Sequence, residues 1–387
     1  MKDISANRIL QKDNLFLLIP VFLYLPFVFL GYGPDSDTYE VLRTGATFIR
    51  NFDYIPSRSP GYFVFEVFAF FANRVGGSVV TNLTVVFMSL VCLYGFYFLC
   101  KTLAIPNPKY LALMVALNPY YWVASTTTMD YVFALGFFFV GVMLLLKKKA
   151  PYAGIAFSLA VGCRMTTALL VVFILILLFV LQLITVKEVG IALALTAVFA
   201  AIFYIPPLDF AKYRWWNIFR PDMGVTEYWS LYLRVGRFIY KNITLFSIPV
   251  WLFFTGMGIY LLKSRVKIEN TFIKIIAVNF VIFLTYEVLF FYVPLEPSYL
   301  LVILPFVFIT IGIFMAGHRK ALPVLLALIF ISNFVVINFA HPNLVNHATG
   351  ARYGLWLDPG YLVEATSNRM KVINCVDLNC YKNSMPN

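Results

Sequence analysis

The feature that most constrains the fold is a series of long apolar stretches. A helix needs roughly twenty mostly apolar residues to cross a bilayer, so we interpret about eleven of these stretches as membrane spans. Of the 387 residues, 61% are hydrophobic and only 12% are charged. A soluble chain would carry about twice as much charge. We therefore expect an all-α polytopic membrane protein, with spans at 14–33, 79–100, 109–125, 129–146, 150–163, 165–186, 188–206, 244–262, 272–293, 297–316 and 321–340.

Lysine and arginine gather at alternate ends of these spans, which predicts the orientation. Basic loops near span ends stay in the cytoplasm, so the net charge of +12 is a topology signal and does not indicate nucleic acid. The basic positions on that side are Lys2, Arg8, Lys12, Lys101, Lys109, Lys147, Lys148, Lys149, Lys187, Lys263, Arg265, Lys267, Lys274, Arg319 and Lys320. We expect an integral protein of a bacterial or archaeal plasma membrane, or of the endoplasmic reticulum, with a cytoplasmic N-terminus.

The expected spans divide the chain into a transmembrane part, 1–340, and a short tail, 341–387, which this orientation places outside the cytoplasm. The orientation also places an outer loop at 34–78 and a second at 207–243 outside the cytoplasm. In the tail, Cys375 and Cys380 have the spacing of a loop disulfide. The tail is too small to predict a catalytic domain.

Two aspartates, Asp35 and Asp37, follow the first span directly. Carboxylates this close to a bilayer are costly and often functional. The helical period after them predicts an amphipathic interfacial helix from Thr38 to Arg50. Because Glu40 stands three residues after Asp37, Asp37 is either the N-cap of this helix or a functional carboxylate. Asp35 is either a solvated turn residue or a functional carboxylate.

Basic residues outside the cytoplasmic loops are candidates for binding a phosphate. The segment 150–163 is too short to cross a bilayer fully, so Arg164 should lie recessed at a hairpin apex. There it either meets an anionic headgroup or reaches toward the interface. In the loop 207–243, the segment from Trp229 to Lys241 predicts a helix with Arg234, Arg237 and Lys241 on one face. Most of its basic residues would be interface anchors, and one or two would contact phosphate.

One carboxylate, Glu287, falls within the ninth expected span. A carboxylate inside a membrane is a functional candidate by default. A buried hydrogen bond between two helices is the alternative reading of this residue.

Several short motifs together resemble a known family. They are Asp35-Ser-Asp-Thr-Tyr39, Arg58-Ser-Pro60-Gly61-Tyr62, Asn118-Pro119-Tyr120-Tyr121-Trp122 followed by Asp130, Gly162-Cys-Arg164, and Glu296-Pro-Ser-Tyr299 followed by Pro305. In order and in side of the membrane, over about residues 14–316, they resemble the GT-C superfamily of polyprenyl-phosphate-dependent glycosyltransferases. The set is most similar to protein O-mannosyltransferases and lipid A aminoarabinose transferases. Ser298 departs from the pattern, because an arginine is common at its position.

The resemblance implies an inverting transfer of a monosaccharide from a polyprenyl-phosphate donor to an acceptor hydroxyl on a glycan, lipid or protein. It places Asp35 in the catalytic position, where a carboxylate can act as general base. Candidates for the donor phosphate are Arg164, Arg214 and Arg220. Supporting positions are Arg58, Tyr39, Asp130, Glu296 and Tyr299. No cofactor is required, although a divalent metal on Asp35 and Asp37 stays open as an alternative.

Two other classes of function stay open at this point. A lipid-linked oligosaccharide polymerase or ligase would use similar donors at the same face of the membrane. A lipid or sugar transporter would bind such lipids without chemistry, and paired discontinuous helices would favour it.

Overall fold

The computed structural model describes residues 12–212, 214, 229–264, 268–318, 320–340 and 353–385. The described elements, in chain order, are η2 (Lys12–Leu17), α1 (Leu18–Tyr24), η3 (Leu25–Phe29), α2 (Ser36–Asn51), α3 (Phe63–Thr102), α4 (Pro108–Leu117), α5 (Pro119–Ser125), α6 (Asp130–Leu146), α7 (Ala150–Cys163), α8 (Thr167–Val180), α9 (Val186–Phe203), α10 (Ile205–Phe210), α12 (Leu231–Phe246), α13 (Ile248–Ser264), α14 (Asn270–Tyr292), η5 (Pro297–Ile303), α15 (Leu304–Phe314), α16 (Ala321–Ile331), β1 (Val335–Ala340), β2 (Tyr353–Pro359), α17 (Tyr361–Lys371) and α18 (Leu378–Ser384).

The predicted polytopic helical membrane protein is confirmed, but not the predicted number of spans. In the described part of the chain, four helical segments are long and apolar enough to cross a membrane: α3, α9, α14 and Pro297–Phe314. Two bent pairs raise this number to as many as six: α5 with α6, bent by 90°, and α12 with the first part of α13, bent by 88°. Shorter apolar helices of 10–17 residues account for most of the other expected spans. The expected count of eleven is therefore not confirmed.

The second expected span, 79–100, is part of a longer helix. Helix α3 has 40 residues and begins at Phe63, inside the loop expected at 34–78. It is kinked where Gly76 and Gly77 leave helical geometry, and Gly77 has a φ of 59°. Glycine tolerates this positive φ, because it has no Cβ to clash with the backbone. The kink joins a helical part that begins in the loop expected at 34–78 to a part that coincides with the expected span at 79–100.

Close backbone contact joins α3 to α6. A Cβ on Gly95 would lie 2.6 Å from the Cβ of Phe139, so only glycine permits this approach. Small residues at such crossings are typical of packing between membrane helices, where contact rather than the hydrophobic effect stabilises association. Large rings, including Phe96, Phe138 and Phe157, fill the surrounding core. The first turn of α6 is thereby held at a fixed place beside α3.

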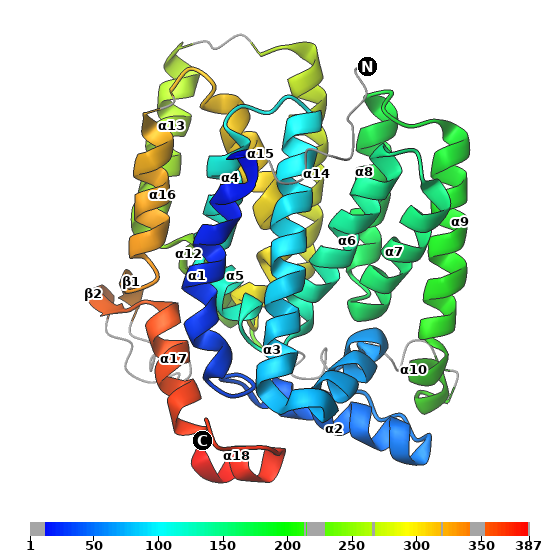
Figure 1. Ribbon diagram of the computed structural model, residues 1–387. Coiled ribbons are helices and arrows are strands. Elements are labelled where there is room, and N and C mark those ends of the chain that lie inside the picture. The colour runs from blue at the N-terminus through cyan, green and yellow to red at the C-terminus, as the bar shows by residue number, and fades with distance from the viewer. Residues whose placement is uncertain are drawn as a thin grey trace.

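The amphipathic helix predicted at Thr38 to Arg50 is confirmed as α2. It lies across one end of the long helices, and α10, α17 and α18 gather at the same end (Figure 1). The N-cap of α2 is Asp35, with a φ of −113° and a ψ of 151°, and its side chain makes no capping hydrogen bond. The prediction of Asp37 as N-cap is therefore wrong: Asp37 lies in the first turn, and its carboxylate bonds Arg58 instead.

The last expected span is also shorter than predicted. Helix α16 ends at Ile331, and residues 335–340 form β1, which pairs antiparallel with β2. The chain then continues as α17 and α18, and a disulfide joins Cys375, in the connection between these helices, to Cys380 in α18. These C-terminal helices lie beneath α1 and beside the start of α2 in Figure 1. The tail is folded against the membrane part of the protein.

Candidate active site

A cavity of about 690 Å³ opens where α12, the α14–η5 connection, β2 and α17 approach the start of α2. Its charged lining residues are Asp35, Glu296, Asp358, Glu364, Arg237 and Lys241. They come from five separate parts of the chain. The cavity has the size of typical small-molecule sites, and it brings carboxylates and cations into one space.

Asp35 reaches this cavity from the end of the 31–35 segment. Its backbone carbonyl accepts hydrogen bonds from the amide and hydroxyl of Thr38, which fixes the first turn of α2. The side chain is only partly exposed. Burial raises the pKa of the Asp35 carboxyl to about 8; the nearby carboxylates of Glu296 and Asp37 add to the rise, whereas Arg58 opposes it. A group with a pKa near neutral pH can both take up and release a proton.

Glu296 is the second carboxylate in this part of the cavity. It precedes Pro297 in the connection between α14 and η5, and the hydroxyl of Tyr131 lies 3.5 Å from its Oε2. Burial raises the pKa of the Glu296 carboxyl, and Asp37 contributes in the same direction. Because Asp35 and Glu296 line one cavity, ionisation of either disfavours ionisation of the other.

A buried ion-pair cluster supports the cavity. One oxygen of Asp130 accepts a hydrogen bond from Arg58 and the other accepts one from Arg164, the latter at 2.7 Å. Arg58 also bonds Asp37 at 3.1 Å. Asp130 is fully buried, and the two guanidinium groups compensate its charge. The cluster ties the start of α2, the connection before α3, the first turn of α6 and the end of α7 together.

Aromatic rings surround the arginines of this cluster. The Arg164 guanidinium lies over the ring of Tyr131 at 4.2 Å and near that of Tyr299 at 5.3 Å. Arg58 lies over the ring of Tyr62 at 4.5 Å. Such contacts favour a cation held away from water. Arg164 does lie at the apex between α7 and α8, as expected, but its guanidinium contacts Asp130 rather than the cavity lining.

The cations that do line the cavity lie on α12. Arg237 and Lys241 stand four residues apart, so they share one face of the helix. The helical spacing predicts this basic face, but the phosphate candidates of the sequence analysis are Arg164, Arg214 and Arg220. Of these, Arg214 is exposed, and Arg220 lies outside the described residues. The signal that could have identified Arg237 and Lys241 was their shared position on an amphipathic helix.

The C-terminal segment supplies the remaining wall. Asp358 of β2 and Glu364 of α17 line the cavity, and the ring of Tyr361 stacks on that of Tyr120 with centroids 4.1 Å apart. Reasoning from the sequence missed this contribution, because the segment reads as a polar tail without a motif. The long separation in sequence leaves no local signal for the contact.

Three other residues singled out in the sequence lie outside the cavity lining. The hydroxyl of Tyr39 donates to the carbonyl of Val372 at 3.5 Å, so Tyr39 faces the C-terminal segment. Tyr299 lies near Arg164 and Tyr131. Glu287 accepts a hydrogen bond from Asn242 at 2.9 Å, which joins α14 to α12 as the structural interpretation predicted.

The two aspartates that follow the first expected span have different surroundings. Asp35 lines the cavity, whereas the carboxylate of Asp37 is engaged by Arg58. Among the described residues, no three His, Cys, Asp or Glu side chains are placed to hold a metal ion together. A divalent ion between Asp35 and Asp37 would have to compete with Arg58 for the Asp37 carboxylate. This arrangement fits a metal poorly.

Comparison with known proteins identifies the architecture. No protein-family model matches the sequence, and no curated protein matches it. Two solved structures of ArnT from Cupriavidus metallidurans are similar. The apo structure is 13% identical with a TM-score of 0.48, covering 80% of this chain and 61% of that one. The structure bound to undecaprenyl phosphate is 12% identical with a TM-score of 0.51, covering 82% and 63%.

The lipid-bound neighbour bears on the fold class. The likeness to the lipid-bound ArnT structure confirms the expected fold, that of an all-α polytopic membrane protein. The chain spans about three fifths of the length of these neighbours. At this level of identity the comparison establishes the fold alone.

Proposed function

We propose that this protein is a membrane glycosyltransferase that moves a monosaccharide from a polyprenyl-phosphate lipid to an acceptor hydroxyl. The observation that carries the proposal is the cavity, in which the Asp35 carboxyl and two cations of α12 share one space. General-base catalysis needs a carboxyl close to the attacking hydroxyl. A departing phosphate needs fixed positive charge. The cavity offers both, on a fold that in one neighbour holds undecaprenyl phosphate.

The reaction would proceed as a single displacement. The acceptor hydroxyl oxygen forms a bond to the anomeric carbon, while the bond from that carbon to the phosphate oxygen breaks. The hydroxyl proton passes to Asp35, and the electron pair leaves with the polyprenyl phosphate. One displacement inverts the anomeric centre.

Each charged group has a part in this step. Arg237 and Lys241 would contact the phosphate as its negative charge increases, which lowers the barrier. Asp35 would act in its ionised form, so the pH at which it ionises limits turnover. Arg58 and Arg164 would not contact the substrate, and would act by holding Asp130 and Asp37 in place.

Apolar side chains in the cavity lining support a lipid-linked donor. Its lining includes the apolar side chains of Ile243, Val336 and Ile337 next to the cations of α12. A lipid phosphate could therefore present its headgroup to Lys241 while its chain stays in an apolar environment. We propose that this face of the membrane is extracytoplasmic, as the distribution of lysine and arginine predicts.

The test is direct transfer of a labelled sugar. Purified full-length protein is incubated with several radiolabelled polyprenyl-phosphate sugars and a membrane extract. Movement of a single labelled sugar to a new product would support the proposal, provided that Asp35→Asn abolishes it. The matched control is Asp53→Asn, which changes an exposed aspartate just after α2. Transfer that persists in Asp35→Asn would contradict the assigned base, and absence of transfer from every donor would contradict the function.

A further inference from the structure

Arg369 of α17 is a buried arginine that the proposed reaction does not use. Its side chain is 2% exposed, and its guanidinium makes five hydrogen bonds. Neutral oxygens accept all five: the carbonyls of Phe27, Leu30, Gly31 and Thr126, and the hydroxyl of Thr126. Removing a guanidinium from water is costly. Such a group is retained where its planar set of donors fixes a particular geometry.

The acceptors of Arg369 belong to two segments that lead into acidic residues. The first segment, 27–31, ends four residues before Asp35. The second contains Thr126, which lies four residues before Asp130. One side chain therefore bonds both segments, although they are far apart in the sequence.

The two segments are also bonded to each other. The amide of Thr128 donates to the carbonyl of Tyr32 at 2.8 Å. The carbonyl of Gly31 accepts from Arg369 and also from the side chain of Asn82, the latter at 2.7 Å. Each segment thus has little freedom to move without breaking bonds to the other. Arg369, which comes from the C-terminal part of the chain, adds hydrogen bonds to both of these segments.

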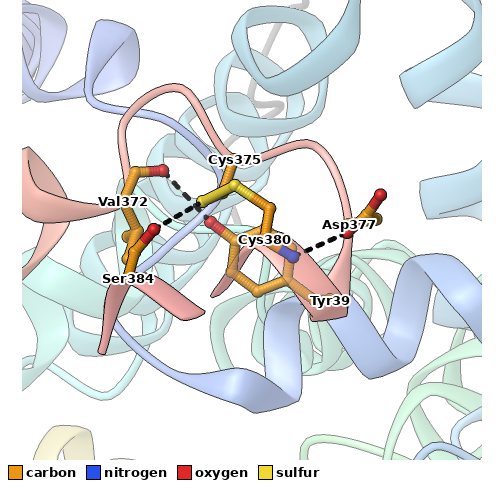
Figure 2. Close-up of a disulfide and its surroundings, with 6 residues drawn as sticks. All are labelled: Tyr39, Val372, Cys375, Asp377, Cys380 and Ser384. Atoms are coloured by element: carbon orange, nitrogen blue, oxygen red, sulfur yellow. Dashed lines mark hydrogen bonds between the residues drawn. A yellow bond between two sulfur atoms is a disulfide. The ribbon is translucent and has the colours of Figure 1, made fainter. Parts of the chain in front are cut away.

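A second contact from the C-terminal segment holds the residue before Asp35. The hydroxyl of Tyr381 donates to the carbonyl of Pro34 at 3.1 Å, and its ring lies 5.1 Å from that of Tyr39. Figure 2 shows the disulfide between Cys375 and Cys380, which closes the turn immediately before Tyr381, with Tyr39 beside it. The C-terminal segment therefore bonds the segment that leads to Asp35 on both sides of Gly31: Arg369 before it and Tyr381 after it.

We propose that Arg369 is a positioning residue, which fixes the Asp35 and Asp130 segments relative to each other so that the Asp35 carboxyl faces the cavity. Tyr381 provides the second point of attachment. The consequence for transfer rests on the proposed function, whereas the consequence for the environment of Asp35 does not. The test therefore begins with a measurement that needs no substrate.

The measurement is the reaction of Asp35 with a hydrophobic carbodiimide, which takes the proton of a protonated carboxyl on one nitrogen and is then attacked at its central carbon by the carboxylate oxygen. Labelling of the full-length protein in detergent is mapped by mass spectrometry across a pH series. The charged and titratable groups that affect Asp35 are Asp37, Arg58, Glu296, Tyr361, Glu364 and Tyr381. Labelling of the wild-type protein should be lost around pH 8. In Arg369→Met the segment is released, water reaches the carboxyl, and this midpoint should fall toward the ordinary range of an aspartate.

Matched variants make the result specific. Arg369→Lys keeps the charge but not the planar donors, so its midpoint should lie between those of the wild type and Arg369→Met. Arg50→Met removes an exposed arginine at the end of α2 and should leave the midpoint unchanged. Tyr381→Phe removes a single hydroxyl, and should lower the midpoint by a smaller amount even if Arg369→Met fails to fold. A wild-type midpoint in the folded Arg369 and Tyr381 variants, or an equal fall in Arg50→Met, would overturn the proposal.

Kinetics give the second readout once transfer is measured. Misplacing a reacting group by about 1 Å costs about a hundredfold in rate. Arg369→Met should therefore lower kcat by up to about a hundredfold while the donor KM changes little, because the five hydrogen bonds of Arg369 go to residues 27–31 and Thr126 and not to α12. An unchanged kcat would contradict the positioning role. Absence of transfer in the wild type would count against the proposed function and leave the labelling result as the test.

Discussion

Arg58 and Asp130 stand 72 residues apart in the sequence and form a buried ion pair between the connection before α3 and the first turn of α6. This pair links the two ends of a charged cluster, with Asp37 on one side and Arg164 on the other. The cluster has no direct place in the cavity lining. It ties the start of α2, which carries Asp35 into that lining, to the connection before α3, the first turn of α6 and the end of α7.

The first prediction concerns the stability provided by this cluster. Asp130→Asn leaves two guanidinium groups with a neutral partner in a fully buried place. Removing one partner of a buried pair costs about 3–5 kcal/mol, because the remaining charge is uncompensated. We expect a clear fall in the free energy of unfolding, measured by thermal unfolding in detergent.

The control for Asp130 is a partly exposed ion pair on α2. Glu40 and Arg43 pair at 3.0 Å with side chains that are 23% and 57% exposed. Glu40→Gln should therefore change the free energy of unfolding by no more than about 1 kcal/mol. Equal effects of the two variants would show that the Asp130 cluster is not a stabilising element.

The second prediction concerns Asp35 as general base. Asp35→Asn is nearly isosteric and cannot accept the proton, so turnover should fall by about two to four orders of magnitude. Donor binding, measured by equilibrium binding of the polyprenyl-phosphate sugar, should be retained. Asp37→Asn still bonds Arg58 through its amide oxygen and should keep most of the activity. Loss of activity in both variants with a dependence on added divalent cation would favour a metal site instead.

The third prediction concerns the cations of α12. Lys241→Met keeps the length and the apolar part of the side chain but removes its charge. A hydrogen bond to a charged group contributes about 1.5–3 kcal/mol, which corresponds to a weakening of donor binding by about ten- to a hundredfold. Lys187→Met changes an exposed lysine on α9 and is the matched control. Wild-type donor affinity in Lys241→Met would remove Lys241 from the phosphate site.

The fourth prediction is a dependence of stability on pH that originates at Asp35. Folding raises the pKa of this carboxyl from 3.8 to about 8, chiefly through burial. Between these values the folded state binds more protons than the unfolded state, so stability falls as pH rises across this range. The melting temperature of the wild-type protein should therefore decrease more steeply with pH than that of Asp35→Asn. Asp53→Asn should keep the wild-type slope, and parallel curves for the wild type and Asp35→Asn would refute the prediction.

Local patterns explain which parts of the structure could be predicted. The apolar stretches identify a membrane protein, because twenty apolar residues have few other stable environments. The amphipathic period after Asp37 predicts α2, and the short segment before Arg164 predicts a turn there. In each case the residues that carry the signal lie within a few turns of one helix. The motif at Asp35 likewise depends only on adjacent residues.

Helix breaks were harder to predict, because they depend on single residues inside apolar stretches. Asn118 ends α4, and its side-chain oxygen accepts from the amides of Tyr120 and Tyr121 to begin α5. A sequence window that averages over twenty residues does not register such a change. The break at Ser247 between α12 and α13, by contrast, lies close to the start of the span expected at 244–262.

The sequence by itself determined the class of protein, the amphipathic helix α2, the basic face of α12 and the candidate carboxylate Asp35. Only the tertiary structure decided that Arg58 and Arg164 compensate Asp130, that Arg237 and Lys241 share a cavity with Asp35, and that Arg369 bonds the segment leading to it. The reason is physical. Helical period and hydropathy follow from neighbouring residues, whereas a contact between positions hundreds of residues apart follows from how complete helices pack.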